Sequence, residues 1–153
     1  MKENFIIVEG ASDVVILNEI LKLTLSEERY KFHFFEAGGY YNAITSVRPI
    51  LDLVSLDSKV LLVFDADTSD PRRIQERIDF VKDHLSYVSR PKNFNFFVFT
   101  PNIDVEIRPI TELSKLKRQH RLEYNEKVQK RIKENIDSIM KIPVIQSIID
   151  FIK

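Results

Sequence analysis

Four short runs of apolar residues, rich in aromatic and β-branched side chains, divide the first two thirds of the chain. They are Asn4 to Val8, Phe32 to Phe35, Val60 to Phe64 and Phe94 to Phe99. Each run has the length and composition of a buried β-strand. The stretches between the runs repeat their apolar residues with the spacing of helices. Examples are Val14, Leu17 and Leu21, then Ile44, Val47 and Leu51, then Ile74, Ile78, Val81 and Leu85. This alternation predicts an α/β fold with a four-stranded, mainly parallel sheet flanked by helices and joined by right-handed crossovers.

Two of the predicted helices begin at side chains that suit a helix start. Ser12 can cap the first helix, and Asp70 followed by Pro71 places a capping acid before a proline at the first helical position. The pattern changes after the fourth strand. We therefore expect residues 1–110 to form the α/β domain and residues 111–153 to form a C-terminal helical extension that packs on the same domain.

The predicted extension has two parts of different character. From Thr111 to Ile139 the sequence is helical and charged, and the pattern leaves open whether this part is one helix or two. Pro143 then begins a short apolar segment, Val144 to Ile152, which we expect to pack back on the core.

The chain has 153 residues and no cysteine, which suits a single domain without disulfides or thiolate metal sites. No apolar run approaches the roughly 18 residues of a membrane span. The segment from Met1 to Asn4 leads directly into a strand without the features of a signal peptide. We therefore expect a cytoplasmic protein that does not enter a membrane.

The formal net charge is zero, but its distribution is uneven. Residues 1–113 hold 13 basic and 18 acidic residues, a net charge of −5, whereas residues 114–153 hold 10 and 5, a net charge of +5. The acidic part is compatible with a metal site and the basic part with an anionic partner. A solvated helix face explains the basic part equally well.

Acidic residues follow every predicted strand, at the edge of a parallel sheet where ligands bind. They are Glu9 and Asp13 after the first strand, Glu36 after the second, Asp65 and Asp67 after the third, and Asp104 and Glu106 after the fourth. All three glycines, Gly10, Gly38 and Gly39, fall after the first two strands. Because glycine adopts positive φ and lets a ligand approach the backbone closely, these positions predict tight, crowded turns.

Asp65 and Asp67 stand two positions apart, so on a continuing strand their side chains point to the same side. Carboxylates so close favour a bound cation, and oxygen ligands suit a hard ion such as Mg²⁺ or Mn²⁺. We expect Glu9, Asp13, Asp65 and Asp67 to hold it. The three histidines are isolated in the sequence and do not suggest a softer metal.

Several of these acids also have a structural interpretation. Asp13 in a first helical turn is stabilised by the helix dipole. Glu36 and Glu106 can equally be ligands, ion-pair partners or surface residues. For Glu9 with Asp65 and Asp67 the structural interpretation is weaker, because burying three acids together without a cation is costly.

Three short motifs in this sequence resemble the signature of the TOPRIM domain family. They are Glu9-Gly10 at the end of the first strand, Gly38-Gly39 after the second, and Asp65-x-Asp67 after the third. The resemblance covers about residues 4–108 and implies a Rossmann-like TOPRIM fold. The family includes topoisomerases, bacterial primases, ribosomal-RNA maturation nucleases, a recombination mediator and the overcoming-lysogenization-defect (OLD) nucleases.

The resemblance implies catalytic and metal-binding roles for particular residues. Glu9 matches the family glutamate that acts as general acid/base or metal ligand, and Asp65 and Asp67 match the metal-binding aspartate pair. The spacing Glu9-x-x-x-Asp13 is similar to that of the OLD nucleases, in which both acids hold metal.

A later part of the chain resembles the further acidic motif of the OLD nucleases. Asp104-x-Glu106 is similar to the motif that helps to hold a second ion, so the resemblance implies one or two divalent ions. Lys115 and Lys117 are candidates for the catalytic lysine of those nucleases.

The resemblance implies metal-dependent hydrolysis of phosphodiester bonds in DNA or RNA. Basic residues near the predicted site are candidates for holding the phosphates. They are Arg72, Arg73, Lys115, Lys117, Arg118 and Arg121. Solvated helical charge is an equally good explanation of these residues.

The chain contains no Gly-x-x-x-x-Gly-Lys-Ser/Thr loop for ATP. The TOPRIM resemblance therefore implies work with a separate partner, as in bacterial anti-phage pairs of an ATPase with a TOPRIM effector. Alternatives are an RNA-maturation nuclease, a non-catalytic module that binds nucleic acid or protein, a toxin-like effector held inactive by its partner, and a receiver-like domain. The oligomeric state is left open, with a homodimer as one alternative.

Overall fold

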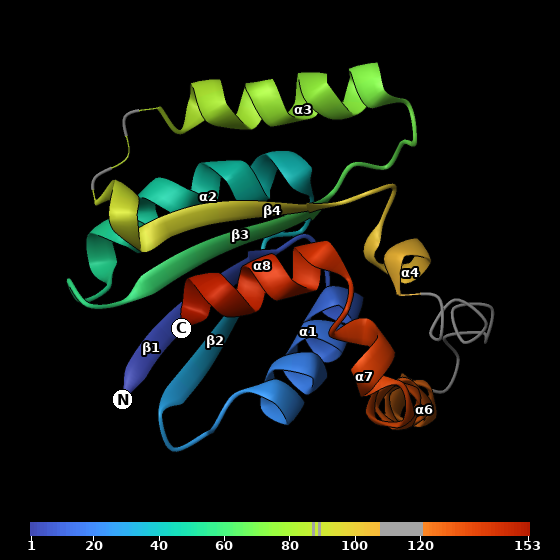
Figure 1. Ribbon diagram of the computed structural model, residues 1–153. Coiled ribbons are helices and arrows are strands. Elements are labelled where there is room, and N and C mark those ends of the chain that lie inside the picture. Colours follow the sequence, from blue (N-terminus) through green and yellow to red (C-terminus); the bar gives the residue numbers. More distant parts are fainter. Residues whose placement is uncertain (87, 89, 108–120) are drawn as a thin grey trace.

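The computed structural model describes residues 1–86, 88, 90–107 and 121–153, apart from the side chains of residues 104, 105 and 121. One sheet lies between two layers of helices (Figure 1). Four strands form it: β1 (Lys2–Val8), β2 (Tyr30–Glu36), β3 (Lys59–Asp65) and β4 (Phe94–Phe99). Their order across the sheet is β2-β1-β3-β4, and every neighbouring pair is parallel. The prediction of a four-stranded parallel sheet flanked by helices is confirmed.

The first three helices follow from the order of the strands. They are α1 (Ala11–Thr24), α2 (Tyr40–Leu53) and α3 (Pro71–His84). From β1 to β2 the chain moves toward one edge, whereas from β2 to β3 and on to β4 it moves toward the other. Right-handed crossovers therefore place α1 on one face of the sheet and both α2 and α3 on the opposite face, as Figure 1 shows.

Alternation of side chains along the strands divides the core into two hydrophobic clusters, one on each face. Ile6 and Val8 of β1 contribute to the cluster beneath α1, whereas Ile7 contributes to the cluster beneath α2 and α3. β3 is apolar on both faces because both are covered by helices, as expected for a strand inside a parallel sheet.

The C-terminal helices lie on the same face of the sheet as α1 (Figure 1). They are α6 (Arg121–Glu134), α7 (Ile136–Ile139) and α8 (Pro143–Ile152). Four isoleucines of α8 are buried in the cluster that also contains the α1 core residues: Ile145, Ile148, Ile149 and Ile152. The apolar segment after Pro143 therefore packs on the core, as predicted. Within residues 121–139 the chain forms two helices, separated at Asn135.

The two predicted helix caps have different outcomes. The Asp70 side chain accepts a hydrogen bond of 3.0 Å from the Arg72 amide at the start of α3, so that prediction is confirmed. The prediction for Ser12 is wrong, because α1 begins one residue earlier and Gly10 is its N-cap. Asp13, three residues after Gly10, accepts a hydrogen bond of 3.2 Å from the Gly10 amide.

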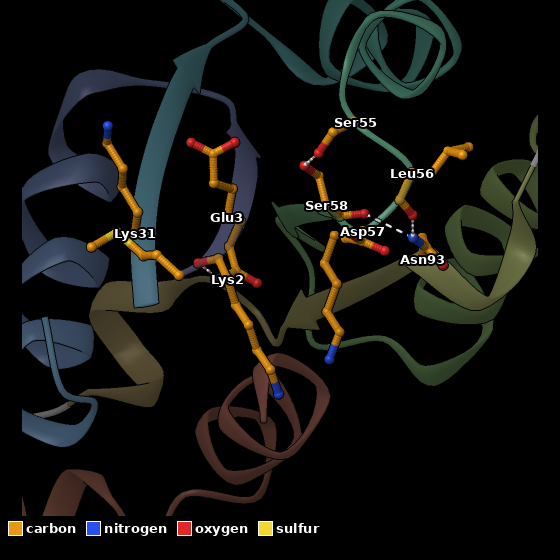
Figure 2. Close-up of a pocket in the computed structure, with 11 residues that line it drawn as sticks. Lys2, Glu3, Lys31, Ser55, Leu56, Asp57, Ser58 and Asn93 are labelled. Atoms are coloured by element: carbon orange, nitrogen blue, oxygen red, sulfur yellow. Dashed lines mark hydrogen bonds between the residues drawn. The ribbon is translucent and has the colours of Figure 1, made fainter. Parts of the chain in front are cut away.

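A pocket of about 730 Å³ opens at the amino end of the strands; we call it the amino-edge pocket (Figure 2). Much of its polar lining is hydrogen-bonded within the chain. The hydroxyls of Ser55 and Ser58 lie 2.7 Å apart, and the side-chain amide of Asn93 donates to the carbonyls of Leu56 and Ser58 at 2.6 and 3.0 Å.

No helix in the described part of the chain has both the length and the apolarity needed to cross a membrane.

Candidate metal site at the carboxyl edge of the sheet

The carboxyl ends of β1 and β3 meet at the point where the strand order reverses. The chain leaves β1 toward β2 on one side and returns through α2 to β3 on the other. Glu9 follows β1 directly, and Asp65 is the last residue of β3. Ligands of open α/β sheets bind at such reversals, because the two crossovers diverge there and leave the strand ends uncovered.

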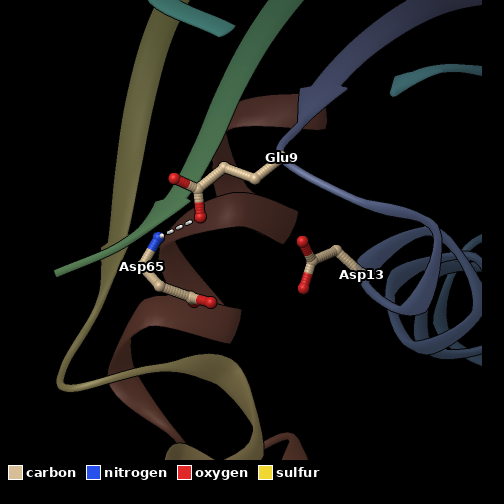
Figure 3. A group of neighbouring side chains, drawn as sticks. All are labelled: Glu9, Asp13 and Asp65. Carbon is tan, nitrogen blue, oxygen red and sulfur yellow. Dashed lines mark hydrogen bonds between the residues drawn. The ribbon is translucent and has the colours of Figure 1, made fainter. Parts of the chain in front are cut away.

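Glu9, Asp13 and Asp65 gather at this reversal, and we call them the acid cluster (Figure 3). Each carboxylate offers one oxygen, and these oxygens all lie within 4.8 Å of one another. The Asp65 amide also donates a hydrogen bond of 3.4 Å to a Glu9 oxygen, which joins the ends of the two strands. All three residues are partly buried.

The turn after β2 holds the Glu9 backbone in place. The amides of Gly38 and Gly39 both donate to the Glu9 carbonyl, at 3.0 and 3.2 Å. Both glycines have positive φ, +75° and +129°, which explains why this turn uses glycine. The prediction of crowded turns is wrong, because a Cβ at either glycine, or at Gly10, would meet nothing within 4 Å. Gly10 has an extended φ of −151° and does not require glycine.

Backbone amides orient the other two acids. The Gly10 amide donates to Asp13, as described above, and the Ile103 amide donates to an Asp65 oxygen at 3.0 Å. Ile103 begins the short helix α4 (Ile103–Glu106) after β4. The side-chain positions of the acid cluster are thus set by the segments that follow β1 and β4.

The hydrogen bonds and positive charges around the acid cluster only partly offset its negative charge. Burial raises the pKa of Asp65 to about 7, and the nearby charges of Asp13, Glu9 and Asp67 also raise it, against the hydrogen bond from Ile103. Burial likewise raises the pKa of Glu9, and the carboxylates of Asp67 and Asp13 add to the effect. Carboxylates that repel one another in a partly buried site gain stability from a proton or a bound cation.

Asp67 lies outside the acid cluster. β3 ends at Asp65, and Asp67 has a positive φ of 57°, so the two-residue alternation that predicted a shared side does not reach it. Its side chain is 59% exposed, and one of its carboxylate oxygens lies 3.7 Å from Arg77. Asp67 acts on Glu9 and Asp65 through its charge.

Arg77 of α3 and Tyr40 of α2 adjoin the acid cluster, and the sequence analysis did not identify either. The Arg77 guanidinium donates to the Asp65 carbonyl at 3.2 Å and stacks on the Tyr40 ring, 4.4 Å from its centroid. The Tyr40 hydroxyl donates to the Arg77 carbonyl at 3.2 Å. The only sequence signal was the spacing of Arg73 and Arg77, which puts both on one face of α3.

Glu106, one of the two acids predicted to hold a second ion, is not part of the acid cluster. Glu106 accepts hydrogen bonds of 3.1 Å from both the amide and the hydroxyl of Thr100, so it braces the turn after β4. The side chain of Asp104 lies outside the described residues. Glu36, at the end of β2, is exposed.

Among the basic residues predicted to hold phosphates, Arg72 and Arg73 are exposed on the first turn of α3. Arg72 lies 3.5 Å from Glu76, and Arg73 lies 4.0 Å from Asp70. The predictions for Lys115, Lys117 and Arg118, and for the side chain of Arg121, fall outside the described residues.

The donor set of the acid cluster fits a hard divalent cation. All three ligand groups are carboxylates, two of them have raised pKa values, and their oxygens are close enough to share one ion. No protein-family model matches the sequence, and comparison with the curated proteins finds no significant match.

Proposed function

We propose that this chain is a divalent-metal-dependent nuclease of the TOPRIM type, which hydrolyses phosphodiester bonds in DNA or RNA. The observation that carries the proposal is the meeting of Glu9, Asp13 and Asp65 where the strand order of a parallel sheet reverses. The TOPRIM-like motifs supply two of these residues. The third, Asp13, has the spacing from Glu9 that resembles the OLD nucleases.

The acid cluster would hold one Mg²⁺ or Mn²⁺. When bound, such an ion would supply Lewis-acid chemistry, which would polarise a phosphodiester and favour deprotonation of an attacking water. The chain supplies three carboxylate ligands, and the amides of Asp65, Gly10 and Ile103 orient them. Because Glu106 is engaged by Thr100, the described residues support a single ion.

Arg77 would neutralise a substrate phosphate beside the acid cluster. Its guanidinium contacts the Asp65 carbonyl and lies 3.7 Å from an exposed Asp67 carboxylate oxygen. A surface ion pair of this kind is weak, so a phosphate can compete for the guanidinium.

A partner ATPase is part of the proposal, since the sequence has no P-loop and the family resemblance includes paired systems.

The test is cleavage of single-stranded DNA, duplex DNA and structured RNA by the purified chain, with Mg²⁺, with Mn²⁺ and with EDTA. We expect cleavage of at least one substrate only when a divalent ion is present. Asp65→Asn preserves the size of the side chain and removes its charge, so it should abolish this cleavage. Asp83→Asn, an exposed position on α3, is the matched control and should cleave as the wild type does.

Two outcomes would contradict the proposal. Cleavage that persists in Asp65→Asn would come from another site or a contaminant. A wild-type chain that binds neither ion in calorimetry, and cuts nothing with or without its partner, would favour a non-catalytic module.

A further inference from the structure

Helices α2 and α3 present two stripes of polar and aromatic side chains on the face of the sheet that they share. The stripe on α3 follows the spacing i, i+4, i+7, i+11, and the stripe on α2 follows i, i+4, i+7, so each lies along one side of its helix. The members are Arg73, Arg77, Phe80 and His84 on α3, and Tyr41, Thr45 and Arg48 on α2. We call the two stripes together the α2–α3 surface.

Aromatic rings on this surface form a connected series. The Tyr40 and Phe80 ring centroids are 6.2 Å apart, those of Phe80 and His84 are 5.0 Å apart, and those of His84 and Tyr41 are 6.1 Å apart. The rings remain accessible, because Tyr41 is 60% exposed and Phe80 is 40% exposed. Exposing a contiguous group of aromatic side chains to water is unfavourable. Such a group therefore indicates a binding surface, whereas single exposed aromatic residues do not.

Two pockets lie along the same surface. One, of about 430 Å³, is lined by Tyr40, Phe80 and Arg77 and by the Ala66–Thr68 segment that directly follows Asp65. The other, of about 390 Å³, is lined by Thr45, Arg48 and His84. The first pocket therefore lies beside the segment that follows Asp65 and is lined by part of the aromatic series, and the second continues that series toward the end of α3.

Cationic side chains accompany the rings along the whole surface. Arg77 stacks on Tyr40 at the end near the acid cluster, and Arg48 reaches across from α2 to the His84 carbonyl at 3.0 Å. Arg73 also lines the first pocket, and its contact with Asp70 is a long, exposed one of 4.0 Å. Asp67 and Glu76 also line the first pocket beside its two arginines, whereas Arg48 is the only charged residue among the described lining residues of the second. An anionic chain that follows this surface thus meets an arginine at each pocket.

We infer that the α2–α3 surface binds single-stranded nucleic acid and leads it to the acid cluster. Unpaired bases stack on Tyr41, Phe80 and His84, while Arg48, Arg73 and Arg77 contact the phosphates. Alternating aromatic and cationic groups suit a single strand, because its bases expose the ring faces that a duplex hides. The inference rests on the proposed function for its direction toward the acid cluster, and it specifies the substrate class.

The experiment measures binding without cleavage. Fluorescence anisotropy is recorded with labelled oligothymidylate, oligouridylate and a DNA duplex, each of about 20 nucleotides or base pairs, in EDTA. We expect the wild-type chain to bind both single strands more tightly than the duplex. The ratio between the two single strands tells whether DNA or RNA is preferred.

Paired substitutions separate stacking from simple burial of apolar area. Tyr41→Leu retains apolar surface but loses the ring face, and we expect it to raise the Kd for a single strand about ten-fold. Tyr41→Phe keeps the ring and should bind more tightly than Tyr41→Leu. Leu53→Ala, at an 85% exposed position on α2 outside the stripe, and Lys82→Gln, on the other side of α3, should leave the Kd unchanged.

Three results would overturn the inference: equal or tighter binding of the duplex, equal Kd values for Tyr41→Leu and wild type, or no binding of any single strand. Circular dichroism of each variant identifies a loss of fold, and a misfolded Tyr41→Leu is replaced by Arg48→Gln, which should also raise the Kd. Because these measurements contain no metal, they stay informative if cleavage fails. Binding of a single strand without metal-dependent cleavage, both by the chain alone and with its partner, would contradict the proposed nuclease while supporting this surface.

Discussion

At the amino end of the strands, lysine side chains meet helix carbonyls, whereas at the carboxyl end carboxylates meet one another. Lys59 donates to the carbonyls of Phe151 and Ile152 at the end of α8, the latter at 3.2 Å, and Lys2 donates to the carbonyl of Lys153 at 3.2 Å. These carbonyls carry the partial negative charge of a helix C-terminus, so they favour the charged lysines. They act against the burial of Lys59 and the charge of Lys2, which lower the pKa of Lys59. The carboxylates of Glu9, Asp13 and Asp65 at the other end lie close together, with raised pKa values for Glu9 and Asp65.

The amino-edge pocket and the acid cluster therefore lie at opposite ends of the strands. The amino-edge pocket, at about 730 Å³, is larger than the two pockets on the α2–α3 surface. Much of its polar lining is nevertheless hydrogen-bonded inside the chain (Figure 2). One buried atom there, Oδ1 of Asn4, lacks a hydrogen-bond partner among the described residues. Charge that the fold brings together without neutralising it is the better sign of a ligand site.

The largest expected effect separates the acid cluster from Asp67. Glu9→Gln, Asp13→Asn and Asp65→Asn should each weaken Mn²⁺ binding about 100-fold, because each removes a proposed direct ligand. Asp67→Asn should weaken it about ten-fold or less, because its carboxylate acts at longer range. Isothermal titration calorimetry measures the affinities. An equal loss of Mn²⁺ affinity in Asp67→Asn and Asp65→Asn would mean that Asp67 is also a direct ligand.

A second effect tests how the β2 turn supports Glu9. Gly39→Ser forces a side chain onto a φ of +129° and should lower the free energy of unfolding by about 2 kcal/mol. Gly10→Ser places a good N-cap residue at an extended φ and should change it by less than about 0.5 kcal/mol. Urea denaturation compares the two variants. Equal losses would mean that the glycines are needed for space and not for backbone conformation.

A third prediction concerns the contacts of Lys59 with the end of α8 at the amino end of the strands. Lys59→Met removes the hydrogen bonds to the end of α8 and the contact between the ammonium and the Phe151 ring, 5.2 Å from its centroid. We expect a loss of about 1 kcal/mol in the free energy of unfolding, with unchanged Mn²⁺ affinity. Lys31→Met, at an exposed lysine lining the same pocket, is the control. A changed Mn²⁺ affinity in Lys59→Met would show that the two ends are coupled.

The smallest effect is the pH dependence of the metal-free chain. The folded-state pKa of Asp65, about 7, lies above the ordinary value of 3.8, so the folded protein binds this proton more tightly than the unfolded chain. The stability from Asp65 is fully present below 3.8 and is lost as pH rises through about 7. Allowing for solvent screening, we expect the melting temperature in EDTA to fall by about 3 °C, or roughly 1 kcal/mol.

Two comparisons check that assignment. Asp65→Asn should reduce the pH dependence and leave the part that comes from Glu9, whose pKa is also raised. Mg²⁺ should raise the melting temperature more at about pH 8 than at about pH 5, because protons compete with the ion. The titratable and charged groups that face Asp65 are Glu9, Asp13, Asp67 and Arg77. All four residues are retained in Asp65→Asn. The same slope in the variant and the wild type would assign the effect to another group.

The periodicity of the sequence predicted the strands and the first three helices closely, because both faces of the sheet need continuous apolar runs and the helices need apolar stripes. It also located Glu9 and Asp65, since a charged residue directly after a buried strand has to lie at the sheet edge. Asp67 shows where this reasoning fails. The two-residue alternation applies only while the strand continues, and β3 ends at Asp65.

By itself the sequence determined the α/β class, the strand ends and the acidic residues that follow them, because these depend on local composition and on burial patterns with short periods. Only the tertiary structure decided which acids meet. That choice depends on strand order, which places β1 beside β3 and brings Asp13 to Asp65. The roles of Arg77 and Glu106 were likewise decided by the packing of α3 and by the turn after β4, which join residues that no local pattern connects.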